Sequence, residues 1–231
     1  MKTIGIIGGL GPESTIDYYQ RMIAAYRERQ PDDNYPPIII NSINMTRVRR
    51  LIEANESGTL VGLLVAEIEK LARAGAECGL ISANSPHLVF DEVSRRAPIP
   101  LVSIVEATCE EAKKLGLKLL GLLGARFTMQ GRFYPDVFGR QGMTLVIPTP
   151  GEQDFIHKIY FSELVLGKFL PETRQRLLAI AERMIEQEGT EGLILAGTEL
   201  PLILKESSYR GIPLLDTTGI HVKAMLDYAM G

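Results

Sequence analysis

The feature that most constrains this fold is an internal repeat of short apolar segments. Each of three segments in the first half has a counterpart in the second half, in the same order and at a nearly constant separation. The pairs are "KTIGIIGG" at 2–9 with "KLLGLLGA" at 118–125, "GAECGLISANS" at 75–85 with "GTEGLILAGTE" at 189–199, and "IPLVSI" at 99–104 with "IPLLDT" at 212–217. One pair alone would mean little, whereas three in register indicate a duplicated subdomain.

Apolar runs typical of buried strands alternate with segments of helical periodicity along the whole chain. We predict strands at residues 2–8, 36–42, 78–85 and 99–104, and again at 117–124, 144–148, 191–197 and 212–216. Helices are predicted from Pro12 and over 59–74, 106–116, 151–166, 172–188 and 218–229. Such alternation favours parallel sheets covered by helices on both faces. The prediction is an α/β protein with two pseudo-symmetric, doubly wound parallel-sheet subdomains, residues 1–110 and 111–231, the last helix being free to pack on the first.

Ligands of open parallel sheets bind beyond the carboxyl ends of the strands. We therefore expect the site in a cleft between the two halves, lined by the loops that follow their strands. The expected loops are Gly8–Thr15, Asn41–Asn44 and Ser82–Ser85 from the first half, and Gly124–Thr128, Gly197–Glu199 and Asp216–Thr217 from the second.

The bulk composition excludes several classes of protein. The chain has 231 residues, of which 45% are hydrophobic and 23% charged, and its net charge of -3 gives no basic surface for nucleic acid. No apolar run reaches the length of a membrane span or a signal peptide. Two cysteines, Cys78 and Cys109, show neither metal-ligand nor disulfide spacing. We expect a cytoplasmic protein without a nucleic-acid or membrane partner.

The glycine-rich turn "GIIGGLGPES" could suggest a nucleotide site, because glycines before a helix can hold phosphate. The third glycine of a dinucleotide motif is replaced by Ser14, and the second predicted strand ends in Asn41-Ser42 where an acid is expected. A turn that binds a small carboxylate through its backbone N–H groups fits as well.

Polar side chains in the predicted loops have both a functional and a local interpretation. His87 follows the loop "SANSP", so it can serve as an acid or base, or form local hydrogen bonds at a helix start. Asn84, Ser85 and Thr198 can hold a substrate, or cap the helices that follow, and Glu199 can favour a helix N-terminus. The three histidines lack metal-ligand spacing, so we predict no metal.

Several motifs resemble those of the aspartate/glutamate racemase family. They are "MKTIGIIGGLGPEST", "SANSPHLVFDEV", "PLVSIVEAT", "GARFTM" and "LILAGTELPLIL", and they extend from residue 1 towards the C-terminus. The resemblance implies a cofactor-independent racemase of acidic amino acids, a homodimer, with its site between two halves. It also implies two facing cysteines, one of which removes the α-proton while the other delivers a proton to the opposite face.

This sequence departs from the family at both of those positions. Ala83 stands where the first cysteine aligns, and Gly197 where the second aligns. Ser82 could be aligned differently, but the two-residue period of a strand turns it to the other side. Neither Cys78 nor Cys109 matches a family position.

Three interpretations follow. The one we favour is an amino-acid racemase that works with other groups, among them His87, Glu199, Ser85 or Thr198. The second is a family member with different isomerase or lyase chemistry on an amino or hydroxy acid. The third is a catalytically silent member, natural or engineered, that only binds an amino acid.

By the same resemblance, several residues are expected to bind the substrate. Asn84, Ser85, Thr128 and Thr198 supply side chains, and Gly9, Leu10 and Gly11 supply backbone donors. Arg47, with Arg49 and Arg50 as neighbours, is the candidate for a side-chain carboxylate, against the alternative of a solvated helix start. Arg126 is a second cationic candidate. The lysine contact of the family has no match near Glu163-Leu164-Val165.

Overall fold

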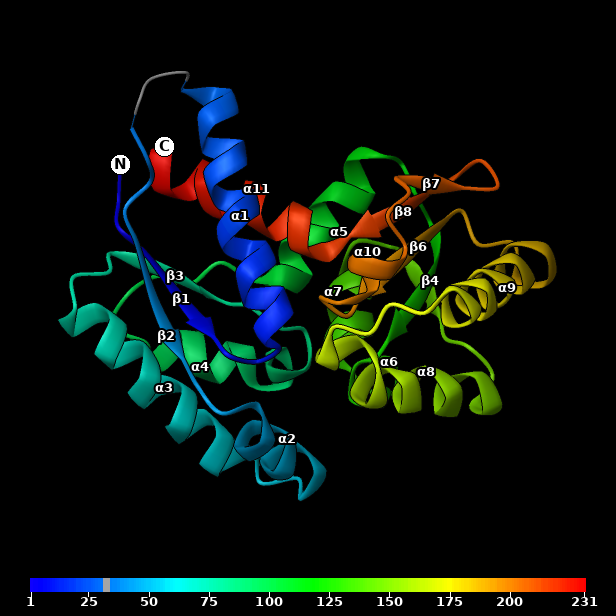
Figure 1. The fold of residues 1–231 in the computed structure, drawn as a ribbon, viewed down its shortest axis with the longest axis horizontal. Coiled ribbons are helices and arrows are strands. Elements are labelled where there is room, and N and C mark those ends of the chain that lie inside the picture. The colour runs from blue at the N-terminus through cyan, green and yellow to red at the C-terminus, as the bar shows by residue number, and fades with distance from the viewer. Residues whose placement is uncertain (31–33) are drawn as a thin grey trace. The chain divides into compact units, whose positions relative to one another are not determined.

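The computed structural model describes residues 1–30 and 34–231, and the chain divides into two compact units. The first unit comprises Met1–Ile104 together with Thr218–Gly231, and the second comprises Val105–Thr217 (Figure 1). The chain leaves the first unit at the beginning of helix α5 (Ile104–Lys114) and returns to it at the beginning of α11 (Thr217–Met230). The last helix therefore belongs with the N-terminal residues.

The first unit is built on a parallel sheet of three strands in the order β2-β1-β3. The strands are β1 (Ile4–Gly8), β2 (Ile38–Ser42) and β3 (Cys78–Ile81), and Ile4 lies in register with both Ile38 and Cys78. The helices, apart from α11, are α1 (Pro12–Arg29), α2 (Met45–Glu53), α3 (Ser57–Arg73), the 3-10 helix η1 (Ser85–Val89) and α4 (Phe90–Arg96).

Side chains of β1 point alternately into two separate cores, as expected for a strand buried on both faces. Ile4 and Ile6 pack with residues of α1 and α11, among them Met22 and Met225. Ile7 packs on the other side with residues of α3 and α4. The helices on these two faces can be followed in Figure 1.

The second unit contains a sheet of five strands in the order β5-β4-β6-β8-β7, parallel except for the antiparallel edge pair β7–β8. The strands are β4 (Leu119–Gly124), β5 (Thr144–Val146), β6 (Gly192–Ala196), β7 (Ser208–Tyr209) and β8 (Ile212–Asp216). Its helices besides α5 are α6 (Arg126–Met129), α7 (Phe133–Arg140), α8 (Pro150–Ser162), η2 (Leu164–Leu166), α9 (Pro171–Glu188) and α10 (Leu200–Ile203).

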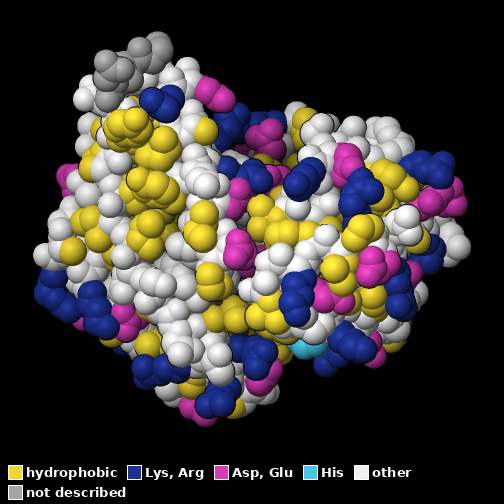
Figure 2. All heavy atoms as spheres, viewed as in Figure 1, with side chains coloured by type: hydrophobic (Ala, Val, Ile, Leu, Met, Phe, Trp, Pro, Cys, Tyr) yellow, Lys and Arg dark blue, Asp and Glu magenta, His cyan; other side chains and the backbone are white. Residues whose placement is uncertain are grey.

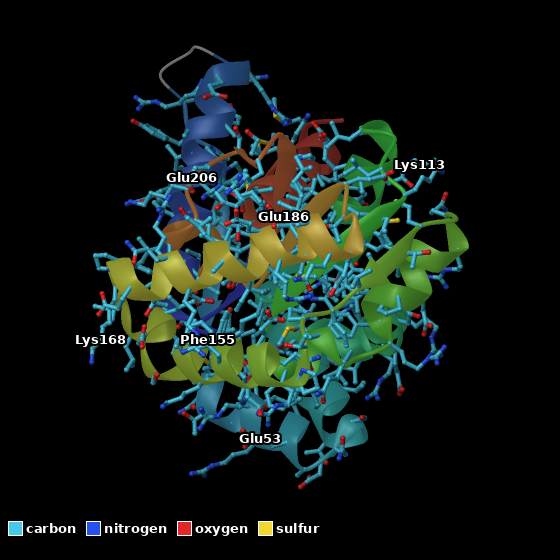
Figure 3. All side chains as sticks on the ribbon, turned by 90° about the vertical axis from the view of Figure 1, so that its right-hand side faces the viewer. Glu53, Lys113, Phe155, Lys168, Glu186 and Glu206 are labelled. Atoms are coloured by element: carbon cyan, nitrogen blue, oxygen red, sulfur yellow. The ribbon has the colours of Figure 1, made fainter. Side chains whose placement is uncertain are left out.

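Helices α8 and α9 lie side by side over the second sheet (Figures 1 and 3). A capping box of Thr149 and Glu152 begins α8. Arg183 of α9 then binds both carboxylate oxygens of Glu152 at 2.6 and 2.7 Å. The ring of Phe155, labelled in Figure 3, lies under the Arg176 guanidinium at 3.9 Å. These contacts fix the position of α8.

The predicted fold class is confirmed, with differences in detail, among them helix α7, which was not predicted. Residues 99–104 were predicted as a strand, but only Leu101 forms an isolated parallel bridge, with Gly79. Pro98 and Pro100 have no N–H to donate, which limits this segment's pairing. The short strand β7 was not predicted.

Lys and Arg side chains and Asp and Glu side chains both occur on the face seen in Figure 2, together with exposed hydrophobic side chains. Within the described residues, no helix is long and apolar enough to cross a bilayer.

Candidate active site

The loop after β3 is held by hydrogen bonds that leave Ala83 at its centre. The Ser82 hydroxyl donates to the Ile7 carbonyl at 2.9 Å, and the Ser14 hydroxyl donates to the Ser82 carbonyl at 3.4 Å. The Ser82 side chain therefore points into the protein, as its strand period predicts. Ala83 and Asn84 are buried, and the Asn84 side chain makes no capping hydrogen bond to η1.

Both ring nitrogens of His87 are occupied by backbone groups of the first unit. Nδ1 lies 2.9 Å from the Ala83 carbonyl, and the Ile104 N–H donates to Nε2 at 3.3 Å. Since a carbonyl only accepts and an N–H only donates, the ring is neutral with its proton on Nδ1. Burial, helped by His221, lowers the pKa of His87 to about 3. His87 thus joins the carbonyl of Ala83 to the start of α5.

A second buried histidine extends this network. His221 of α11 donates from Nε2 to the Val102 carbonyl at 2.9 Å and accepts from the Tyr18 hydroxyl at Nδ1, 2.8 Å away. Burial lowers the pKa of His221 to about 4, so this ring is neutral as well. The His221 ring packs edge-on against the His87 ring, with centroids 6.1 Å apart, and so supports the residue that holds the Ala83 loop.

The glycine-rich turn after β1 requires glycine for space as well as for conformation. Gly9 has a φ of 75°, and a Cβ built on it would lie 2.3 Å from the Ile43 carbonyl oxygen. Its N–H donates to the Thr15 hydroxyl at 2.9 Å. Leu10 buries its side chain in the core, and Gly11, with a φ of 136°, precedes α1. Only backbone groups of this turn remain as candidates for binding.

Arg47 lies in an open hollow formed by α2 and the loop after it. The hollow has a volume of about 410 Å³, and it is lined by Asn44, Thr46, Arg47, Arg50, Leu51, Ala54 and Glu56. The Asn44 side chain caps α2 by accepting from the Arg47 N–H at 3.2 Å. The hollow offers two guanidinium groups, whereas Arg49 pairs with Glu53 at 3.6 Å.

The loop after β6 in the second unit carries a buried carboxylate. Glu199 has no exposed surface, and Thr198 is 1% exposed. The hydroxyl of Tyr160, on α8, donates to Glu199 Oε2, and the Thr198 hydroxyl donates to the same oxygen at 3.1 Å. Glu199 makes no capping hydrogen bond to α10. Sequence reasoning missed Tyr160 because only the fold brings it to this loop.

The loop after β4 contains two of the predicted site residues, Thr128 and Arg126. Thr128 is fully buried, and a Cβ built on Gly124 would lie 3.2 Å from the Cβ of Thr128. Arg126 is bound at the surface by Asp154 at 2.7 Å, and its N–H donates to His157 Nδ1 at 3.3 Å. The Arg126 guanidinium is therefore already paired.

Neither thiol belongs to a candidate loop, since Cys78 lies in β3 and Cys109 in α5. Both are free and buried, and burial raises the pKa of each to about 11. Neither supplies a thiolate at neutral pH. Among residues 1–30 and 34–231, no cluster of three or more His, Cys, Asp or Glu side chains could hold a metal ion.

Comparison with known proteins identifies the family. The sequence model of the Asp/Glu/Hydantoin racemase family matches residues 7–225. The chain belongs to this family. The family is one of isomerases, the enzyme class that the sequence motifs predict.

Similar proteins match nearly the whole length of the chain. The chain is 25% identical to the broad specificity amino-acid racemase RacX of Bacillus subtilis (strain 168) over 96% of this chain and 95% of that one. Its structure resembles that of an aspartate racemase homologue from Pyrococcus horikoshii OT3, at 37% identity, a TM-score of 0.83 and complete coverage of both chains. It also shares the fold of the Picrophilus torridus aspartate racemase, at 22% identity and a TM-score of 0.78, over all of this chain and 95% of that one.

Proposed function

We propose that this protein transfers a proton at the α-carbon of a small, acidic amino acid without a cofactor. Membership of a racemase family supports the reaction type. The observation that carries the proposal is the buried Glu199. Its side chain makes no capping hydrogen bond to α10 and accepts hydrogen bonds from Tyr160 and Thr198. A desolvated carboxylate at the end of a strand is a suitable acid–base group.

The proposed substrate contacts come from the loops of both units. Asn84, Ser85 and Thr198 would bind the α-carboxylate and α-amino groups, with help from Thr128 and from backbone groups of the turn at Gly9, Leu10 and Gly11. Arg47 and Arg50 would bind the side-chain carboxylate, because a guanidinium matches a carboxylate in charge and shape. A single shared cleft remains our prediction.

The positions of the family's cysteines take different roles in this proposal. Ala83 and Gly197 carry no titratable group. The proton-transfer role passes to the loop of Glu199, and His87 acts as a positioning residue for the Ala83 loop, because both of its nitrogens bind backbone groups.

The test follows α-deuterium exchange by NMR in heavy water with L- and D-aspartate and L- and D-glutamate. Exchange that falls at least about 100-fold in Glu199→Gln supports the proposal. As a control, Glu191→Gln changes an exposed glutamate whose carboxylate binds only backbone N–H groups at the start of β4. Saturable binding without exchange would instead identify a silent member that binds amino acids.

We also propose a cytoplasmic homodimer. The family resemblance supports the dimer, and the free, buried thiols are compatible with a reducing compartment. Sedimentation equilibrium at micromolar concentration tests the dimer, and a monomer mass would contradict it.

A further inference from the structure

Gly197 is a glycine because its neighbour needs the space. A Cβ built on Gly197 would lie 2.5 Å from Cε2 of Tyr160 and 3.1 Å from its hydroxyl oxygen. A contact below 3.0 Å cannot be accommodated without a shift. Gly197 does not have a positive φ, so its backbone conformation would accept any L-residue. The three atoms nearest to such a Cβ all belong to Tyr160, so Tyr160 is the first obstacle to a side chain at this position.

Tyr160 is firmly held in that place. It lies on the buried face of α8 and is 9% exposed, while Glu199 behind it has no exposed surface. The Tyr160 hydroxyl donates to Glu199 Oε2. Its helix is anchored by the Glu152–Arg183 contacts to α9. A substituent on residue 197 would thus meet a fixed ring, and the phenol oxygen occupies the space that such a side chain would fill.

We propose that Tyr160 takes the place of the side chain that residue 197 lacks, and that its phenol, paired with Glu199, is the proton-transfer group of this loop. This inference rests on the proposed function and assigns its reacting atom. Tyr160 is 9% exposed as a residue, whereas Glu199 has no exposed surface, so we assign the substrate contact to the phenol, with Glu199 acting through it.

Tyr160 and Glu199 together accept and return the transferred proton. The Cα–H bond breaks, its electron pair stays on the substrate and spreads into the α-carboxylate, and the proton moves to the Tyr160 oxygen. At the same time the phenolic proton moves to Glu199. The reverse transfers return a proton to the α-carbon, and exchange of the protons on Tyr160 and Glu199 with solvent introduces deuterium.

This proton relay, from the substrate to Tyr160 and from Tyr160 to Glu199, avoids a free phenolate. Burial and the negative charge of Glu199 hold the pKa of Tyr160 well above its ordinary value of 10.0. The resting phenol is therefore protonated at neutral pH, and only a concerted transfer to Glu199 lets its oxygen accept a second proton.

The packing half of the proposal is tested by a double-mutant cycle of thermal unfolding. Gly197→Ala should lower Tm by about 5 °C or more, the expected effect of overpacking in a chain of this length. In a Tyr160→Ala background the same change should have no such effect. Gly151→Ala, on the same helix with nothing within 4 Å of its Cβ, is the matched control and should not lower Tm. Equal losses from Gly197→Ala in both backgrounds would overturn the packing assignment.

The chemical half is tested by α-deuterium exchange with aspartate and glutamate. Tyr160→Phe keeps the ring and removes the hydroxyl, so exchange should fall by about 100-fold or more. The double variant Tyr160→Phe/Glu199→Gln should lose no more than either single variant, because the two groups act as one unit. Tyr134→Phe removes another buried hydroxyl of the same unit, one that is hydrogen-bonded to Thr108, and should exchange like the unaltered protein.

The possible outcomes separate the two proposals. Exchange by the unaltered protein that persists in Tyr160→Phe overturns the role of the phenol and leaves the proposed function standing. Absence of exchange in the unaltered protein overturns the function and the relay together, while the unfolding cycle still decides whether Tyr160 fills the space at Gly197.

Discussion

At the scale of single residues, the buried histidines give the protein a distinctive dependence on pH. His87 and His221 have pKa values of about 3 and about 4 in the folded state, both lowered from 6.5 by burial. The unfolded chain therefore binds more protons than the folded chain between those values and about 6.5. The stabilisation from neutral histidines is complete above pH 6.5 and decreases as the pH falls.

We expect the free energy of unfolding to decrease from pH 7 to pH 5, by up to about 1.4 kcal/mol per pH unit for each histidine towards the acid end. Urea unfolding at half-unit steps measures this slope. Carboxylates with lowered pKa, such as Glu67 and Glu152, contribute mainly below this window. His87→Gln should reduce the pH dependence of the free energy of unfolding by about the contribution of one histidine. An unchanged slope in that variant would contradict the neutral state assigned to His87.

The cysteines carry a second prediction at this scale. Because burial raises the pKa of Cys78 and Cys109 to about 11, neither thiol should react with a disulfide reagent in the native protein at pH 7.5. Both should react after unfolding in urea, and α-proton exchange should be unaffected by the reagent. Rapid labelling of the native protein together with loss of α-proton exchange would mean that one of the thiols takes part in the reaction.

At the scale of elements, the close approach of β4 and β6 depends on two glycines of β4. A Cβ on Gly124 would lie 2.6 Å from the Ala196 carbonyl oxygen, a backbone atom. A Cβ on Gly121 would meet the ends of the Leu193 and Met184 side chains at 2.4 and 2.8 Å. Side-chain ends can move, whereas a backbone oxygen within a sheet cannot.

Gly124→Ala should therefore destabilise the protein by about 1–3 kcal/mol, and Gly121→Ala by less. Urea unfolding measures both differences. Gly139→Ala in α7, where nothing lies within 4 Å, is the control and should be neutral or slightly stabilising. The reverse order of the two β4 variants would show that the sheet adjusts more easily than the side chains behind it.

The strands were largely predictable because the repeat and the apolar periodicity both report burial, whereas helix α7 was missed. Strands β1 and β6 lie within the predicted segments, since apolar residues on both faces mark a central parallel strand. Residues 99–104 gave the same signal, but a strand also needs donors, and Pro98 and Pro100 supply none. A short apolar run therefore predicts that a segment is buried better than it predicts that the segment pairs as a strand.

The sequence predicted which loops carry the candidate site, but not which distant residues contact them. The loops at Ala83 and Gly197 follow from the repeat, and they still await a functional test. The partner of Gly197 could not be found, because Tyr160 lies on a helix far away in sequence and no local pattern connects the two. A glycine at the end of a buried strand signals a close approach without naming the residue that approaches.

At the scale of the whole molecule, the two units carry unequal chemical groups at equivalent positions of the repeat. Racemisation requires removal of a proton from one face of the α-carbon and delivery to the other. The loop of Glu199 carries a buried carboxylate hydrogen-bonded to a phenol, whereas the loop of Ala83 carries a methyl group beside a neutral His87 with both ring nitrogens hydrogen-bonded.

We therefore expect exchange with solvent to exceed inversion by about tenfold or more, since a proton returns to the face from which it left. Chiral chromatography of the amino acid, run beside the NMR exchange measurement on the same samples, gives the ratio. Inversion as fast as exchange would mean that the first unit also transfers a proton efficiently, and Ser85→Ala would then be the variant to measure next.

The return of α11 to the first unit has a consequence for biosynthesis. Val222, Met225 and Leu226 complete the core around Ile4 and Ile6, and His221 accepts a hydrogen bond from the Tyr18 hydroxyl. A ribosome delivers these residues only after every residue of the second unit has been made. During translation, Val105–Thr217 can fold as soon as it emerges, while the earlier-made N-terminal sheet must wait with one apolar face uncovered. We therefore expect the nascent chain to be most exposed to aggregation at the end that was synthesised first.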